Sequence, residues 1–354
     1  MDGKRLQPNT TAFAGTGEGS WTGPSASDER IPNRQTVGTT ASRDVSFTYD
    51  HAADSALRDV TLTVPAGECM VLCGASGCGK TSYTRVVNGP IPSFFHGAFA
   101  GSQTTCALDV EALPIDRLTP LVGSVFQNPK TQYFNANVAD ELAFPAENMG
   151  LPAEEVNHRI MAVAERFGIV SLLNRSIFHL SGGQKQRIAV AAATMLGPRL
   201  VVLDEPTSNL DANAIADMRV MIEQIKAEGL TVVIAEHRLA WLNGVADRYV
   251  VFDGGRIVHD YEAGEFLSLS PGCVAARGLR ALDLRPYRHR ISALASHSAA
   301  TGNAPDLLAP MVSPSDTKTR TASPAPFPIC ISTPAKSPVS WAITATAKPH
   351  SCAR

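Results

Sequence analysis

A glycine-rich segment that ends in a lysine and a threonine is the strongest chemical signal in the chain. It reads Gly74-Ala-Ser-Gly-Cys-Gly-Lys-Thr81 and matches the phosphate-loop pattern GxxxxGK[ST]. The apolar run Cys69–Cys73 precedes it, and a helix is predicted over Lys80–Val87. Glycines let backbone N–H groups turn toward a phosphate, and the helix N-terminus adds a positive dipole end. The segment predicts a nucleotide-phosphate site, with a chance glycine turn that caps a helix as the alternative.

Within this loop, Lys80 is expected to reach the β- and γ-phosphates, and the Thr81 hydroxyl is expected to hold Mg²⁺. Six further residues are predicted to line the nucleotide: Gly74, Ser76, Gly77, Cys78, Gly79 and Ser82. Cys78 is interpreted as a spacer whose backbone matters more than its thiol. A redox role for that thiol is the alternative, because a helix N-terminus can make a thiol reactive.

Two carboxylates end a second apolar run, Leu200-Val-Val-Leu-Asp204-Glu205. Successive strand residues point to opposite faces, so the two acids are expected to have different roles. We expect Asp204 to hold Mg²⁺, directly or through water, and Glu205 to polarise the attacking water. A solvated strand end is the alternative interpretation.

The segment Leu180-Ser-Gly-Gly-Gln-Lys-Gln-Arg187 lies about twenty residues before the acidic strand. It resembles the signature motif of the ATP-binding-cassette (ABC) family. The resemblance implies that Ser181, Gly182, Gly183 and Gln184 act in trans on the ATP held by an opposite subunit. Since the sequence has one phosphate loop and one signature, a complete site would need a second ABC ATPase, either a copy of this chain or a relative.

Four further residues match family positions in the expected order. The resemblance implies that Tyr49 stacks on adenine and that Gln127 senses Mg²⁺ and faces the membrane partner. It also implies that Asp211, in Ser208-Asn-Leu-Asp211, belongs to the loop that crosses the dimer interface. His237 would be the switch histidine that contacts the γ-phosphate. Taken singly, a lone histidine or tyrosine is more often structural.

Patterning of apolar residues predicts the elements that position these groups. Predicted strands are Val45–Tyr49, Leu57–Val64, Cys69–Cys73, Leu200–Leu203, Leu230–Ala235 and Tyr249–Phe252. Predicted helices are Lys80–Val87, Ala153–Phe167, Gly182–Leu196 and Ala212–Ala227. Buried strands that alternate with helices indicate a parallel sheet of the α/β class. The resemblance implies a P-loop NTPase ABC cassette with a RecA-like core, a small antiparallel β subdomain and an α-helical subdomain at about 128–185.

Composition is that of an ordinary globular protein, with 44% hydrophobic residues and a net charge of −2, which does not suggest nucleic-acid binding. Residues 1–42 are rich in Gly, Ser, Thr and Pro and are predicted to be a disordered leader before an ABC domain at 43–284. Residues 285–354 contain ten prolines and two acids and are predicted to be a disordered, low-complexity tail. The start lacks the apolar stretch of a secretory signal, so we expect a cytoplasmic protein. The family resemblance further implies that it is held peripherally on the cytoplasmic face of the membrane.

Several segments resemble the energy-coupling-factor ATPases more specifically, including Asn88–Gly97, Asp140–Phe144 and Ala235–Leu239. That resemblance implies an ATP-hydrolysing importer subunit for a vitamin or metal ion. It also implies a transmembrane coupling protein and a substrate-capturing membrane protein as partners. Such ATPases are often tandem, and here residues 285–354 stand where a second half would begin. Either an out-of-frame sequence or a disordered extension would account for them.

Other interpretations stay open at this point: an exporter ATPase, or a truncated tandem without activity of its own. A non-transport ABC ATPase is disfavoured, because only about fifty residues separate Gln127 from Ser181 and they carry no extended heptads.

Overall fold

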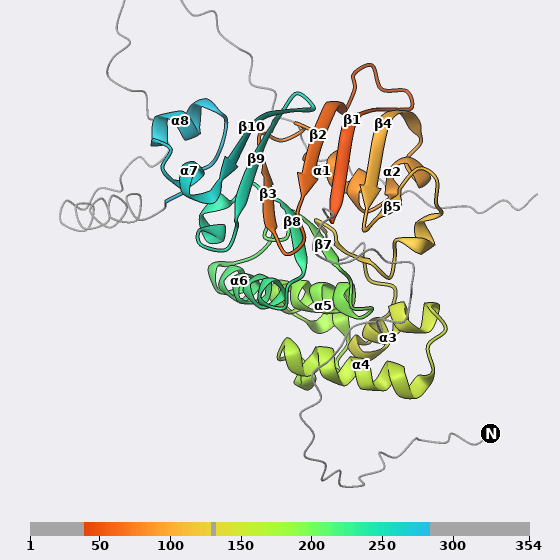
Figure 1. The fold of residues 1–354 in the computed structure, drawn as a ribbon. Helices are drawn as coiled ribbons and strands as arrows, with labels where there is room; N and C mark the ends of the chain where they lie inside the picture. The colour runs from red at the N-terminus through yellow and green to blue at the C-terminus, as the bar shows by residue number, and fades with distance from the viewer. Residues whose placement is uncertain (1–38, 129–131, 284–354) are drawn as a thin grey trace, which may run out of the picture. The chain divides into compact units, whose positions relative to one another are not determined.

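The computed structural model describes residues 39–128 and 132–283 (Figure 1). The predicted tail and most of the predicted leader lie outside the described residues. No helix in the described ranges is long and apolar enough to cross a membrane.

A six-stranded sheet forms the centre of the described chain, in the order β10-β9-β3-β8-β7-β6. Its strands are β3 (Cys69–Cys73), β6 (Val122–Val125), β7 (Leu200–Asp204), β8 (Thr231–Ala235), β9 (Arg248–Asp253) and β10 (Arg256–Glu262). Five strands run parallel, as predicted, whereas β10 pairs antiparallel with β9 at the edge. The four strands β3, β7, β8 and β9 are apolar and almost fully buried, as strands covered on both faces must be.

A second sheet is antiparallel, in the order β2-β1-β4-β5. Its strands are β1 (Thr40–Tyr49), β2 (Leu57–Val64), β4 (Gly97–Thr105) and β5 (Leu108–Asp109). β1 begins at Thr40, inside the stretch expected to be a leader. Thr40 and Ser42 are buried there and hydrogen-bond to Gln103 on β4. The sequence did not predict a strand at these residues because they are polar and their bonding partner is distant in the chain.

Helix α1 (Lys80–Val87) packs between the two sheets and contacts β4, β7 and β8. Tyr83, Val86 and Val87 of α1 share one hydrophobic core with Phe47 of the antiparallel sheet and Phe252 of β9. Helix α2 (Pro90–Ser93) and the short 3₁₀ turn Ile115–Arg117 follow α1 along the chain. This packing fixes the direction of α1, whose N-terminus ends the glycine-rich loop.

A second core covers the opposite face of the central sheet with α5 (Gly182–Thr194) and α6 (Ala212–Ala227). Helices α3 (Val138–Asn148) and α4 (Ala153–Arg166) pack on each other and on α5, beside α5 in Figure 1. Three 3₁₀ turns (170–172, 177–179 and 239–242) and two short helices, α7 (Ala263–Leu267) and α8 (Pro271–Ala276), complete the described elements. Residues 132–185 are therefore mainly helical.

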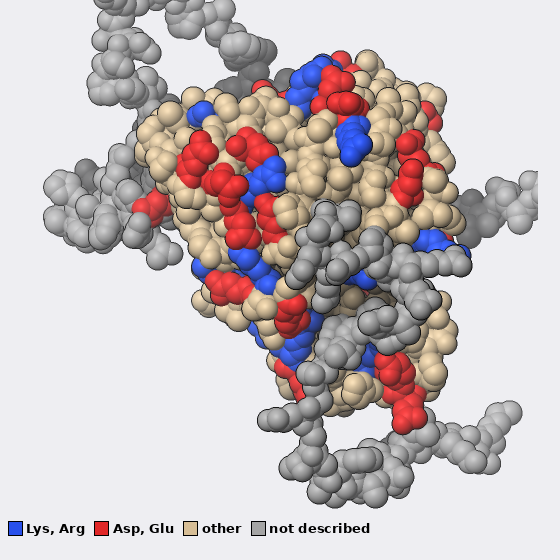
Figure 2. Space-filling model, in the orientation of Figure 1, with Lys and Arg blue, Asp and Glu red and all other residues tan. Residues whose placement is uncertain are grey.

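Acidic and basic side chains are interspersed over the face of the molecule that Figure 2 shows. Ion pairs across elements of the described chain include Arg248 with Asp260 and Lys226 with Asp247.

Candidate nucleotide and catalytic site

The glycine-rich loop connects β3 to α1 and takes a conformation that glycine alone accepts easily. Gly74 has φ of 141°, and a Cβ there would lie 2.2 Å from the Phe252 carbonyl oxygen. Gly79 has φ of 111°, and a Cβ there would lie 2.8 Å from the Ala56 carbonyl oxygen. The backbone is therefore wound against its neighbours so tightly that side chains at these points are excluded.

Lys80 lies under this loop, with 4% of its surface exposed. Its ammonium donates to the carbonyl oxygens of Gly74 and Ala75, both at 3.0 Å, and approaches the Cys78 sulfur at 3.5 Å. Cys78 itself is buried, with 4% of its surface exposed. A cavity of about 120 Å³ is lined by Gly77, Gly79, Lys80–Ser82, Ala56, Glu205 and His237.

The two acids contact different partners, although strand alternation is not the reason: β7 ends at Asp204, and Glu205 follows it with φ of 43°. Asp204 Oδ1 accepts a hydrogen bond from the Thr81 hydroxyl at 3.1 Å. Burial raises the pKa of the Asp204 carboxyl, the bond from Thr81 lowers it, and the charge of Glu205 raises it. The Thr81 hydroxyl and the Asp204 carboxylate are hard oxygen donors, the type that Mg²⁺ takes together with water and phosphate oxygens. The pair therefore fits a magnesium ion.

Glu205 is held between two side chains that come from distant parts of the chain. Its Oε2 accepts from Gln127 Nε2 at 2.9 Å, and its Oε1 lies 2.9 Å from His237 Nε2. Glu205 also has φ of 43°, a left-handed conformation that is uncommon for a residue with a side chain. Such strained residues cluster at functional sites. Gln127, Glu205 and His237 thus converge where the parallel strands end, beside Lys80 and Thr81.

Tyr49 lies at the end of β1, where its hydroxyl hydrogen-bonds with Ser82 and Arg85, each at 3.1 Å. The guanidinium of Arg85 stacks over the Phe95 ring with its carbon 4.3 Å from the centroid. The ring of Tyr49 is partly buried and meets Phe47 edge-on. The tyrosine is therefore tied to α1 and to the phosphate loop through Ser82.

The signature segment forms the start of α5, with Ser181 as its N-cap. Ser181 Oγ accepts from the Gln184 amide at 3.2 Å, and the Gln184 side chain accepts from the Ser181 amide at 3.0 Å. A Cβ on Gly183 would lie 2.7 Å from the Cβ of Ala214 on α6, so glycine permits the close contact of the two helices. Asp211 caps α6 in the same way, accepting from the Ala214 amide at 2.8 Å.

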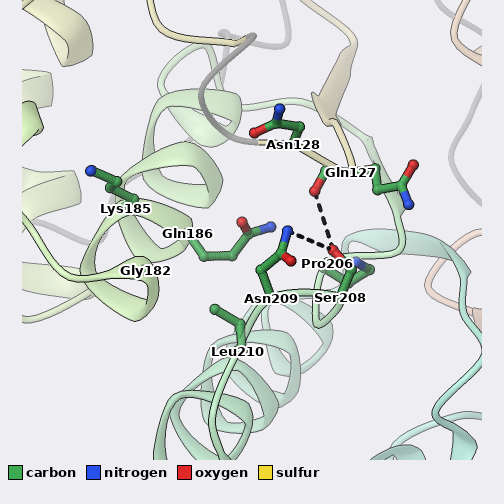
Figure 3. A pocket seen from close by; sticks show the side chains of 9 residues that line it. All are labelled: Gln127, Asn128, Gly182, Lys185, Gln186, Pro206, Ser208, Asn209 and Leu210. Atoms are coloured by element: carbon green, nitrogen blue, oxygen red, sulfur yellow. Dashed lines mark hydrogen bonds between the residues drawn. The ribbon is translucent and has the colours of Figure 1, made fainter. Parts of the chain in front are cut away.

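A larger cavity of about 490 Å³ lies beside the signature, as Figure 3 shows. It is lined by Gln127, Asn128, Gly182, Lys185, Gln186, Pro206, Ser208, Asn209 and Leu210. The Gln186 side chain points into it, is buried, and has no hydrogen-bond partner for Nε2 among the described residues. No residue of the phosphate loop lines this cavity, so the signature and the loop of one chain face different cavities.

Sequence reasoning missed Glu236, which lies next to His237 and is 2% exposed. It also missed Thr207, which is fully buried and donates to Glu236 at 2.7 Å. The only available signal was a charged residue directly after the apolar strand β8, in Ala235-Glu-His-Arg238. That signal is ambiguous, because a charge at a strand end is usually solvated.

The architecture and the wound loop define a P-loop nucleotide-binding fold. A family profile described as "ABC transporter" matches residues 57–208. A putative ABC transporter ATP-binding protein of Treponema denticola is 43% identical over 242 residues, covering 68% of this chain and 50% of the relative. One of Pyrococcus abyssi is 38% identical over 230 residues, covering 63% of this chain and 82% of the relative. The chain belongs to the family of ABC transporter ATP-binding proteins.

Among solved structures, CbiO1 of Clostridium perfringens, described as part of the ABC transporter complex CbiONQ, is similar with a TM-score of 0.61. It is 25% identical, and the alignment covers 73% of this chain and 99% of CbiO1. The chain spans about half the length of the first curated relatives it matches, at 50% and 49%.

Proposed function

We propose that this chain binds and hydrolyses ATP as the motor subunit of an ABC transporter. The observation that carries the proposal is the convergence of Gln127, Glu205 and His237 on the end of the phosphate loop. A carboxylate held by two side chains is oriented in advance, which is what a group that activates water requires. The loop and Lys80 supply the phosphate site.

In this mechanism Glu205 orients and polarises the water that attacks the γ-phosphate, and His237 fixes Glu205 through Nε2. Lys80 exchanges its contacts with the loop carbonyls for phosphate oxygens and offsets their negative charge. Thr81, Asp204 and Gln127 would hold Mg²⁺, which supplies charge neutralisation on the phosphates when bound. Tyr49 supplies an aromatic face for adenine, beside Ser82.

We assign Ser181, Gly182, Gly183 and Gln184 to the site of a second cassette. The separate cavities of loop and signature support this assignment, because one chain does not bring both to one nucleotide. The N-terminus of α5 would present its amides to that phosphate. Asp211 and the loop before it would lie at the same interface. The second cassette is another copy of this chain or a related ATPase.

A mixing experiment tests the trans arrangement directly. Lys80→Ala disables the phosphate loop and Ser181→Ala disables the signature, so each variant alone should be inactive. A mixed dimer has one site in which both parts are intact, and random mixing should restore up to about a quarter of wild-type ATPase activity. Restored activity requires contribution in trans, whereas a mixture as inactive as its components contradicts it.

The transporter is proposed to be an importer of the energy-coupling-factor type for a vitamin or metal ion. The segments quoted above and the likeness to CbiO1, part of the complex CbiONQ, support this assignment. The chain would then sit peripherally on the cytoplasmic face with a transmembrane coupling protein and a substrate-capturing membrane protein. ATPase activity should be measured for the chain alone and coexpressed with such a coupling protein. ATP binding without hydrolysis in either state would contradict the motor assignment.

A further inference from the structure

Two charged residues flank the proposed switch histidine and tie it to the loop that follows Glu205. We infer that Glu236 is a positioning residue for hydrolysis, acting through His237, and that Arg238 fastens the same loop from the other side. The inference rests on the role proposed above for His237. It concerns hydrolysis itself and is independent of the cargo.

The Glu236 carboxylate accepts three hydrogen bonds from the two loops that meet at the site. Oε1 accepts from the backbone amides of His237 at 2.8 Å and Arg238 at 2.9 Å. Oε2 accepts from the Thr207 hydroxyl at 2.7 Å. The carboxylate therefore fixes the backbone that carries the imidazole and joins it to the chain two residues after Glu205.

Burying the Glu236 carboxylate costs free energy unless hydrogen bonds satisfy its oxygens. Glu236 is 2% exposed and Thr207 is fully buried. The donors to Glu236 in the described part of the chain are one hydroxyl and two amides, and no lysine or arginine forms an ion pair with it there. A carboxylate buried without a cation is stable only while such hydrogen bonds hold it, so its geometry is tightly fixed.

The backbone around Glu236 is fixed as firmly as its side chain. Its amide donates to the Leu72 carbonyl at the end of β3 at 3.0 Å. The amide of Glu205 donates to the Ala235 carbonyl at 2.8 Å. Glu236 thus stands between the strand that leads into the phosphate loop and the residue proposed to activate water. His237 Nε2 reaches Glu205 from this fixed point at 2.9 Å.

Arg238 supplies the second attachment, to residues 208–210. Its guanidinium donates to the carbonyl oxygens of Leu210 at 3.3 Å and Ser208 at 3.4 Å. The Ser208 hydroxyl in turn donates to the Gln127 carbonyl at 3.4 Å, a contact drawn in Figure 3. Residues 207–210 are therefore hydrogen-bonded to the chain on both sides of His237, through Glu236 and Arg238.

The test compares Glu236→Met, which keeps the length of the side chain and removes its acceptors, with Glu236→Gln. Glutamine can still accept from both amides through Oε1, whereas its Nε2 reverses the bond with the Thr207 oxygen, so the contacts that fix the backbone of His237 and Arg238 are kept. Gln103→Met is the matched control, because Gln103 is fully buried and hydrogen-bonded in the antiparallel sheet, away from His237.

In the full-length chain we expect Glu236→Met to lower kcat about 10- to 100-fold with little change in KM for ATP. Glu236→Gln should keep kcat within a few-fold of wild type. Gln103→Met should lower the melting temperature as Glu236→Met does, with kcat retained. A Met variant that is folded and turns over like wild type overturns the inference.

A double-mutant cycle with His237→Ala separates positioning from general damage. If Glu236 acts through His237, adding Glu236→Met to His237→Ala should cost little further activity, and losses that multiply overturn the inference. If His237→Ala itself is fully active, the proposed role of His237 fails instead. The imidazole NMR resonances of His237 provide a measurement without turnover: they should shift in the Met variant and stay in place in the Gln variant. Unchanged resonances in the Met variant also overturn the inference.

Discussion

Glu205→Gln is the substitution that most directly tests the chemistry proposed for the site. Glutamine keeps the shape of the side chain and removes the negative charge that polarises water. In the native site, one carboxylate oxygen accepts from Gln127 and the other lies 2.9 Å from His237 Nε2. A glutamine amide can offer an oxygen to only one of these two neighbours and must present its NH₂ group to the other.

The expected loss of rate follows from the lost negative charge and from the lost acceptor for one of the two neighbours. Removing a positioned general base lowers the rate about 10²- to 10⁴-fold, which corresponds to roughly 3–5 kcal/mol of barrier. The NH₂ group of glutamine also forces either a donor–donor contact with Gln127 or a changed tautomer of His237. We therefore expect the loss to fall in kcat, whereas ATP binding through Lys80 and the phosphate loop should persist.

The assay combines phosphate release, equilibrium ATP binding and the oligomeric state with ATP present. The variant should bind ATP, accumulate as a closed dimer and release phosphate slowly. Glu223→Gln is the matched control, because Glu223 lies half-exposed on α6, paired with Arg219 at 2.9 Å. Phosphate release by Glu205→Gln at a rate near that of wild type would refute the role assigned to Glu205.

Three further predictions concern the loop, the metal pair and the signature. Lys80→Ala should weaken ATP binding about 10- to 100-fold, because it removes charged hydrogen bonds to phosphate, and an unchanged Kd would count against the phosphate-loop assignment. Asp204→Asn should abolish Mg²⁺-dependent turnover yet raise the stability of the fold, and with it the Tm, near pH 7. Burial raises the pKa of Asp204, so the folded wild type is stabilised by protonation and loses that contribution as pH rises through the folded pKa. The Tm difference between variant and wild type should therefore vanish below about pH 4, the ordinary pKa of aspartate, and grow above it. A difference that does not depend on pH would contradict the argument that burial raises the pKa of Asp204. Ser181→Ala removes an N-cap and should cost about 1 kcal/mol of stability, measured by chemical denaturation. The variant should still bind ATP but lose hydrolysis. Turnover at the wild-type rate would show that the serine has no part in the mechanism.

The elements that the sequence predicts well are those whose own residues decide their structure. β2, β3, α1 and α6 begin and end at the predicted residues, because apolar alternation, an apolar run or helical spacing stops there abruptly. The phosphate loop is equally local, since glycines and a lysine at fixed spacing determine it.

Elements that depend on distant partners were not predicted. β4 (Gly97–Thr105) has few apolar residues and is stabilised as a strand by pairing with β1. β6 has only four residues and is held by β7. Helix α3 contains Pro145 and lies in a segment noted only for its family resemblance. In each case packing or pairing with a neighbouring element stabilises a structure that the residues of the segment alone do not indicate.

In the candidate site, too, residues in short local patterns were predicted and residues that depend on distant partners were not. Lys80, Asp204 and Glu205 could be found in the sequence because each belongs to a short pattern with a chemical reason. Glu236 could not be found, because its importance comes from two amides and a buried hydroxyl brought together by folding.

The place of β3 in the central sheet has a consequence for synthesis of the chain on the ribosome. β3 lies between β8 and β9, and Cys69 pairs with Val232. Translation therefore delivers the phosphate-loop strand more than 150 residues before either neighbour exists. During that interval an apolar five-residue strand has two unpaired edges, the kind of surface that chaperones cover and that aggregates form on.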